Sequence, residues 1–184
     1  MKKTLSLLLT LMLLAVPALS AFADFGWEDG LFFLYDANLA LAVPEGAVAA
    51  GEAELDALNA ANPSSPQVIF MAHNPATGIS CATALKTLDD PELIAGFVVE
   101  YINNMAAEFD IDPSAITREV IPFFSGESLL FTCTYNASGV DIECISYLFD
   151  VGPNIYMIAI AAPEIHNDAF DPFLAQLFAP MYEE

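Results

Sequence analysis

Basic residues are nearly missing from this 184-residue chain. Four Lys and Arg side chains stand against 25 Asp and Glu, a formal net charge of −21 at pH 7. Two of the four are Lys2 and Lys3, which leaves Lys86 and Arg118 for the rest of the chain. Proteins bind nucleic acids and anionic lipid surfaces by neutralising phosphates with Lys and Arg. The sequence therefore excludes nucleic acid and an anionic membrane surface as partners.

Histidine and cysteine are also scarce, which limits nucleophilic catalysis. The chain has two His and three Cys, and a nucleophile needs a base within hydrogen-bond reach. Cys81, His166 and Asn167 could be drawn as a thiol-protease set, but an activated Cys needs electropositive surroundings. His73, the other histidine, precedes Asn74 in a predicted loop. Zinc-ligand spacings, a Gly-x-Ser-x-Gly elbow and phosphate or dinucleotide loops are missing. We predict no catalytic residues and no cofactor.

The acidic residues are dispersed along the chain and form no block. This dispersion is typical of a solvated, self-repelling surface, which favours a monomer and attracts cations weakly. Asp110-x-Asp112 opens like a calcium-binding loop. The loop then fails, because Ala115 replaces the required glycine and Ile121 the required glutamate. We predict no specific metal site.

Other carboxylates have structural explanations. Glu164, Asp168 and Asp171 gather where a helix is expected to begin, and negative charge stabilises that end of a helix. Glu100 and Glu108 fall on the expected solvent side of another helix. Spacing alone selects no carboxylate pair for glycoside cleavage. An exported carboxylate-dependent hydrolase and a calcium-dependent adhesion or structural module remain alternative functions.

The first 23 residues have the pattern of a secretory signal peptide. Lys2 and Lys3 precede an apolar run from Leu5 to Val16, and Ala21-Phe22-Ala23 forms a small-x-small cleavage site. The run is shorter than the roughly 20 residues that cross a membrane. We predict cleavage between Ala23 and Asp24 and a secreted, extracytoplasmic location.

Residues 24–184 have the size and composition of one globular domain. Hydrophobic residues make up 56% of the chain, with 14 Phe and 6 Tyr. Such a composition is too apolar for disorder, and the length allows a substantial core.

Short apolar runs in the first half predict strands. A hairpin is expected over 31–43 with its turn at 36–38, and a strand pair over 68–72 and 78–85. The alanine-rich segment 47–61 favours a short helix.

The second half predicts a long helix, a strand meander and a closing helix. Asp89-Asp90-Pro91 is typical of a helix start, and apolar residues recur every three or four positions as far as Phe109. Strands are expected over 117–124, 128–135, 140–149 and 155–162, followed by a helix over 167–182.

The turn between the middle two strands decides whether Cys133 and Cys144 can bond. A two-residue turn at Ser138-Gly139 places them opposite each other, and a four-residue turn beginning at Asn136 places them on a diagonal. A disulfide and two buried thiols both remain open. The sequon Asn136-Ala137-Ser138 is interpreted as turn chemistry.

Three segments of the chain bear on its family: the stretch from Leu39 to Gly46, the meander from Thr117 to Pro163 and the terminal helix. Together with the element order, they resemble the PsbP-like and DcrB-like group of exported proteins. Ala47 stands where that group often has an aromatic residue. It implies an α+β fold, an antiparallel sheet of about six to eight strands flanked by two or three helices in a PsbP-like sandwich. It also implies a role in binding or assembly, without shared catalytic residues.

Export, a dense core and missing catalytic sets together predict a secreted, non-catalytic binding or assembly protein. Its expected partner is an extracellular or envelope macromolecule or a small ligand.

Overall fold

The computed structural model describes residues 25–63, 65–124, 126–164 and 167–178. The predicted signal peptide, residues 1–23, and its cleavage site between Ala23 and Asp24 lie outside these residues. Within them, no helix has both the length and the apolar character that a membrane span requires.

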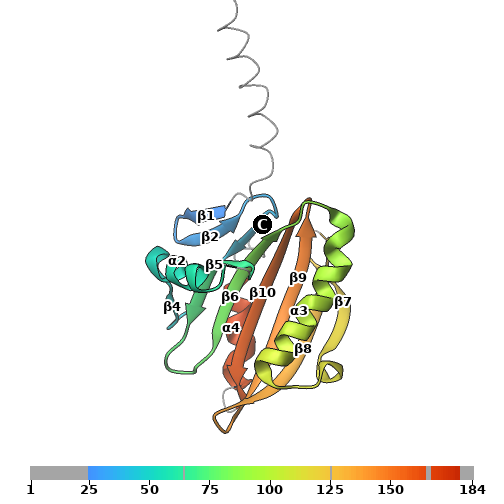
Figure 1. The fold of residues 1–184 in the computed structure, drawn as a ribbon. Helices are drawn as coiled ribbons and strands as arrows, with labels where there is room; N and C mark the ends of the chain where they lie inside the picture. The colour runs from blue at the N-terminus through green and yellow to red at the C-terminus, as the bar shows by residue number, and fades with distance from the viewer. Residues whose placement is uncertain (1–24, 64, 125, 165–166, 179–184) are drawn as a thin grey trace, which may run out of the picture.

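A seven-stranded antiparallel sheet forms the centre of the molecule (Figure 1). Its strand order is β4-β5-β6-β10-β9-β8-β7. The strands are β4 (Val48–Ala49), β5 (Gln67–His73), β6 (Ser80–Thr87), β7 (Thr117–Phe123), β8 (Gly126–Ala137), β9 (Val140–Val151) and β10 (Asn154–Pro163). The four predicted strands of the second half are thus found as a meander, and its last strand, β10, also pairs with β6.

A second, three-stranded sheet consists of β1 (Phe25–Glu28), β2 (Leu31–Leu34) and β3 (Leu39–Leu41). The predicted hairpin over 31–43 corresponds to β2 and β3, and β1 was not predicted. Two hydrogen bonds tie the β2–β3 turn to β10: the Tyr156 hydroxyl and the Asn154 side-chain amide donate to the two carboxylate oxygens of Asp36, at 2.5 and 2.9 Å. The small sheet is therefore fixed to the central strand of the large one.

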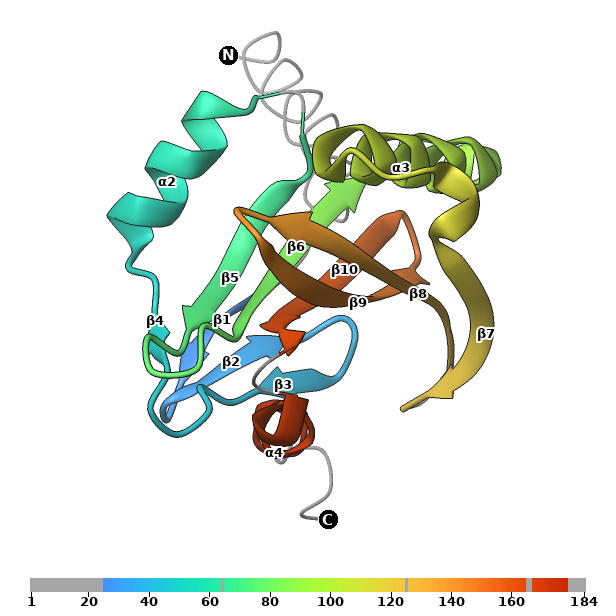
Figure 2. The ribbon, with the colours of Figure 1, turned by 90° about the horizontal axis from the view of Figure 1, so that it is seen from below.

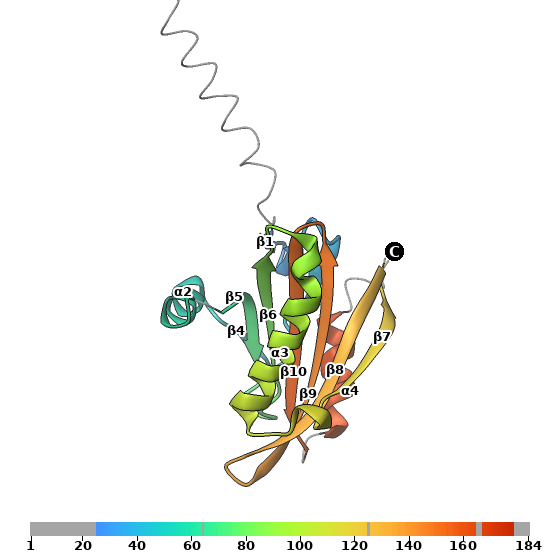
Figure 3. The same cartoon turned by 45° about the vertical axis from the view of Figure 1, so that its right-hand side comes forward.

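In the described part of the chain, three α-helices complete the fold: α2 (Glu52–Ala61), α3 (Ile94–Phe109) and α4 (Asn167–Leu177). Viewed along the sheet, α3 covers one face, while α4 and the small sheet cover the other (Figure 2). Figure 3 shows the same layers from the side, with α2 standing away from the sheet beside β4 and β5. The expected α+β class, strand number and helix number are confirmed.

The two faces of the sheet carry separate cores because side chains alternate along β10. Tyr156, Ile158 and Ile160 point toward α4 and the small sheet, where Phe70 and Phe173 are also buried. Ile155 and Met157 point toward α3. The predicted apolar stripe of α3 is confirmed, since all its members pack into this second core: Ile94, Phe97, Val98, Tyr101, Met105 and Phe109.

One predicted helix boundary is wrong. The helix expected over 47–61 begins only at Glu52, because Val48 and Ala49 pair with His73 and Ala72 of β5 as the edge strand β4. The closing helix begins at Asn167 as expected and ends at Leu177, because Phe178 already lies in a turn. Residues 179–182 of its predicted range lie outside the described residues.

Candidate functional site: a cavity beneath the N-terminal hairpin

A cavity of about 390 Å³ lies between the β1–β2 hairpin, α2 and the start of β5. Its apolar lining comes from all three elements: Phe25, Trp27, Phe32, Leu55 and Val68. This volume is in the range of small-molecule sites, which are mostly apolar and carry a few placed polar groups. The cavity can therefore take a small organic ligand.

Trp27 provides the most accessible aromatic surface of the cavity. It is 50% exposed, although its ring packs edge-on against Phe32, with 5.4 Å between ring centroids, and lies 5.8 Å from Phe70. Phe32 and Phe70 are buried, so they hold the indole against the core while part of it faces solvent. An indole held in this way can stack on a ligand or attract a cation to its face.

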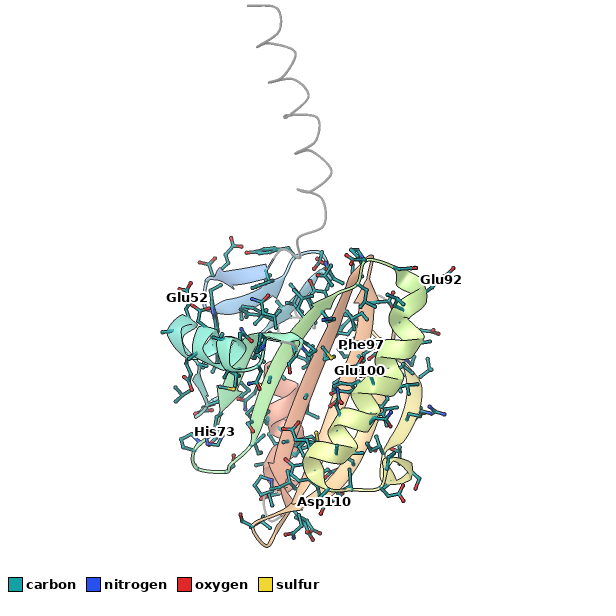
Figure 4. The ribbon with its side chains drawn as sticks, in the orientation of Figure 1. Glu52, His73, Glu92, Phe97, Glu100 and Asp110 are labelled. Carbon is teal, nitrogen blue, oxygen red and sulfur yellow. The ribbon has the colours of Figure 1, made fainter. Side chains whose placement is uncertain are left out.

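Two carboxylates of α2 give the cavity a negative rim. Glu52 and Asp56 both line it, are solvent-exposed, and are four residues apart, so they lie on one side of the helix. Figure 4 shows Glu52 at the end of α2 that lies beside the β1–β2 hairpin. Lys86 and Arg118 do not line this cavity. Its field therefore favours a positively charged ligand.

The position of α2, and so of the acidic rim, depends on Asn59. The Asn59 side chain donates to the Val68 carbonyl at 2.9 Å and accepts from the Val68 N–H at 2.8 Å. It thus binds the backbone of β5 with both ends of its amide. None of the ten residues of α2 is buried, so apolar packing holds the helix only weakly and this pair of hydrogen bonds matters more.

A second cavity, of about 270 Å³, lies beside the turn between β7 and β8. Phe123, Phe124 and Phe149 line it, with Glu127 and Asp150 as its carboxylates. Phe123 and Phe124 already pack against Phe178 of the C-terminal segment, at 5.9 and 5.6 Å between centroids. The second cavity is smaller, and its most exposed ring, Phe124, is 38% exposed against 50% for Trp27, so we favour the first cavity as the ligand site.

The thiol-protease arrangement considered from the sequence gains no support. Cys81 is buried on the α4 side of the sheet, and burial raises the pKa of its thiol to about 12. A thiol with a raised pKa stays protonated and is a weak nucleophile. His166 lies outside the described residues. The other histidine, His73, lies at the end of β5 and pairs in register with Ser80, next to Cys81. Its side chain is exposed, whereas Cys81 is buried.

The acidic segments considered for calcium have structural roles. Asp110 is the left-handed C-cap of α3, with φ of 54°. The Asp112 carboxylate accepts from the Ser114 N–H at 2.8 Å and caps a short 3₁₀ helix. The pKa of Asp112 is lowered first by hydrogen bonding with the Ser114 side chain and then by this backbone bond. Asp168 lies in the first turn of α4, as expected. In the described ranges, no three His, Cys, Asp or Glu side chains are grouped as metal ligands.

The sequon side chain also has the structural role that was predicted. The side-chain oxygen of Asn136 accepts from the Gly139 N–H at 2.9 Å, and its side-chain NH₂ group donates to the Asp141 carboxylate at 2.7 Å. These bonds close the turn between β8 and β9.

Comparisons with known proteins find similarity to solved structures. No protein-family model and no curated protein sequence matches the chain. The structure is similar to the solution structure of cyanobacterial PsbP (CyanoP) from Synechocystis sp. PCC 6803, with 10% identity and a TM-score of 0.39 over 88% of this chain and 93% of that one. The resemblance to the PsbP-like group noted in the sequence thus has a counterpart among solved structures. At this TM-score it carries no argument about function, and the proposals below rest on this chain's own residues.

Sequence reasoning missed the cavity residues. Trp27 falls outside every strand and helix predicted from the sequence, and Glu52 lies in the alanine-rich segment predicted to be helical. Their proximity depends on how β1, α2 and β5 pack, which no local periodicity reports. One feature of the sequence could have indicated this site. Trp27 is the only tryptophan of the chain, and it lies among polar and glycine residues, away from the apolar runs that form the core.

Proposed function

We propose that the protein is an exported, non-catalytic binding protein that binds a small organic cation with an apolar part beneath the β1–β2 hairpin. The observation that carries this proposal is the half-exposed Trp27 in a cavity with two carboxylates at its rim. A cation over an indole face gains about 0.5–2 kcal/mol, more as the site is desolvated. The apolar lining would favour the organic part of the ligand.

The acidic surface supports the same ligand class. The chain beyond the predicted signal has 25 acidic and two basic side chains, so cations are concentrated near the whole molecule. Glu52 and Asp56 add a local attraction where an aromatic surface is available. Both carboxylates are exposed and lack the water-excluding surroundings of a hydrolytic site, so binding is favoured over carboxylate catalysis.

The only tryptophan lies in the proposed site, so its fluorescence reports on this cavity. Benzyltrimethylammonium, added to the protein without its signal peptide, should change Trp27 emission in a saturable way. Benzyl alcohol and benzoate, which present the same ring with neutral or negative charge, should bind at least about tenfold more weakly.

Charge variants separate local from general attraction. The double change Glu52→Gln with Asp56→Asn should weaken benzyltrimethylammonium binding by roughly tenfold. Glu100→Gln with Glu108→Gln removes the same charge from the solvent side of α3 and should leave the affinity nearly unchanged. Equal affinity for the three ring compounds, or equal effects of the two double variants, would contradict the proposal.

Export is tested separately. When the full chain is expressed in a bacterium with a general secretion pathway, we expect the protein outside the cytoplasm with Asp24 as its first residue, measured by N-terminal sequencing. An uncleaved chain recovered from the cytoplasm would refute the export part and leave the ligand test intact.

A further inference from the structure

Cys133 and Cys144 face each other across the β8–β9 hairpin. The turn has two residues, Ser138 and Gly139, both with positive φ, and Ala137 pairs with Val140 beside it. The register then places Cys133 directly opposite Cys144. The two-residue alternative considered from the sequence is therefore confirmed, and the diagonal arrangement is wrong.

The two sulfur atoms already interact. The Cys144 thiol and Cys133 share a side-chain hydrogen bond, which lowers the pKa of Cys133 and, together with burial, raises the pKa of Cys144. The Cys144 Sγ also lies 4.0 Å from the Ser146 hydroxyl.

The distance between facing positions suits a covalent bond. Cβ atoms of directly opposed residues in an antiparallel pair are about 4.5–5.5 Å apart. A disulfide requires a Cβ separation of about 3.5–4.5 Å. A closure of about 1 Å within one hairpin therefore suffices, without any change of register.

We propose that Cys133 and Cys144 form an intramolecular disulfide by thiol–disulfide exchange with a small-molecule or protein disulfide. One of the two cysteines, as its thiolate, attacks the oxidant's disulfide, forming a mixed disulfide and releasing one thiol. The other cysteine sulfur, after losing its proton, attacks the first cysteine sulfur and releases the second thiol. The oxidant gains two electrons and two protons, and the protein loses two hydrogen atoms.

Helix α3 controls access to this pair. Both cysteines are 5% exposed and belong to the core under α3, together with Met105 and Ala106 of its last turns. Phe109, also at this end of the helix, stacks on Tyr135 of β8 with 4.0 Å between ring centroids. An oxidant therefore meets the thiols before α3 docks, and exchange belongs to the folding phase.

The chain contains its own control. Cys81 is 2% exposed but lies in the opposite core, paired in register with Ala72 and Ile160. The sheet separates it from the other two cysteines, so it has no cysteine partner on its face. Cys81 should stay a thiol when the other two are oxidised.

The test is refolding in a redox buffer. The reduced, unfolded chain without its signal peptide is refolded in reduced and oxidised glutathione, and its thiols are counted in denaturant. We expect one thiol per chain, a mass decrease of two hydrogen atoms and a proteolytic peptide that links Cys133 to Cys144. The Cys81→Ser variant should retain no thiol. Native reduced protein should oxidise much more slowly than refolding protein.

Other results overturn the proposal. Three thiols after refolding, a glutathione adduct that persists on Cys133 or Cys144, or a bond that includes Cys81 would each do so. As a second measurement, the oxidised wild-type protein should melt several degrees above the reduced one, because closing the hairpin restricts the unfolded chain. An oxidised form that melts no higher would contradict a bond compatible with the fold. Neither result depends on whether the cavity binds a cation.

Discussion

At the scale of single residues, Thr83 is a buried polar group that the fold leaves without a hydrogen bond. It is fully buried between Phe70 of β5 and Ile158 of β10. Among the described residues, its hydroxyl has no hydrogen-bond partner. A buried polar atom in this condition costs about 1–3 kcal/mol of stability.

Replacing Thr83 by valine should therefore stabilise the protein. We expect Thr83→Val to raise the free energy of unfolding by about 1 kcal/mol, or Tm by about 2–4 °C. Thr87→Val is the matched control on the same strand, because the Thr87 hydroxyl donates to Asn154 at 2.8 Å and its loss should destabilise. Thermal unfolding of both variants checks the prediction, and a similar loss of stability in both would refute it.

The buried Tyr101 hydroxyl should make the protein less stable as the pH rises above 10. Burial raises the pKa of its hydroxyl to about 12 from an ordinary 10. Above pH 10 the unfolded chain loses this proton while the folded chain keeps it, so stability falls as pH rises. The loss is about 1.4 kcal/mol per pH unit until about pH 12. Urea unfolding on both sides of pH 10 should show a smaller fall for Tyr101→Phe than for wild type; equal falls would contradict it.

At the scale of secondary-structure elements, α2 is the described helix that is held most weakly to the rest of the fold. It buries none of its residues and depends on the two hydrogen bonds between Asn59 and Val68. Asn59→Ala should lower the free energy of unfolding by about 1–2 kcal/mol and increase amide hydrogen exchange within α2. It should also weaken benzyltrimethylammonium binding, because the acidic rim moves with the helix.

Asn62 provides the comparison for this change. Its amide donates to the Leu58 carbonyl of the same helix at 3.1 Å and contacts no strand in this way. Asn62→Ala should therefore leave exchange in the rest of α2 and ligand binding almost unchanged. Similar exchange in both variants would show that Asn59 does not hold the helix to the sheet.

An element could be predicted from the sequence where its local residue pattern alone determines its secondary structure. The long helix α3 and the strands β7–β10 repeat an apolar period over many residues, so pattern and fold agree. In contrast, β1 has four residues, and only its pairing with β2 makes it a strand. Val48 and Ala49 have a helix-favouring neighbourhood but pair with β5, an example of tertiary structure overriding propensity.

The cavity could not be predicted for the same reason. Trp27, Glu52 and Val68 come from three elements whose packing decides that they meet. The cysteine pair was different, because a hairpin register depends on the length of one turn. The sequence therefore reduced its geometry to two alternatives, and the structure decides between them.

At the scale of the whole molecule, the excess of acidic residues opposes folding through self-repulsion. Added sodium chloride screens these charges, since the screening length falls from about 30 Å at 0.01 M to about 8 Å at 0.15 M. We expect Tm to rise by several degrees over this range, measured by thermal unfolding. The double variant Glu100→Gln with Glu108→Gln should respond less. A Tm that is constant or falls with salt would refute the prediction.

The same salt should act in the opposite direction on ligand binding. Screening weakens the attraction between Glu52, Asp56 and a cation, so the Trp27 titration with benzyltrimethylammonium should show lower affinity at 0.15 M than at about 0.01 M salt. Tighter packing of a more stable protein would instead strengthen binding or leave it unchanged. If added salt raises Tm and lowers the affinity for the ligand, the acidic charges attract the ligand and destabilise the folded protein. If Tm and affinity change in the same direction, an electrostatic binding site is contradicted.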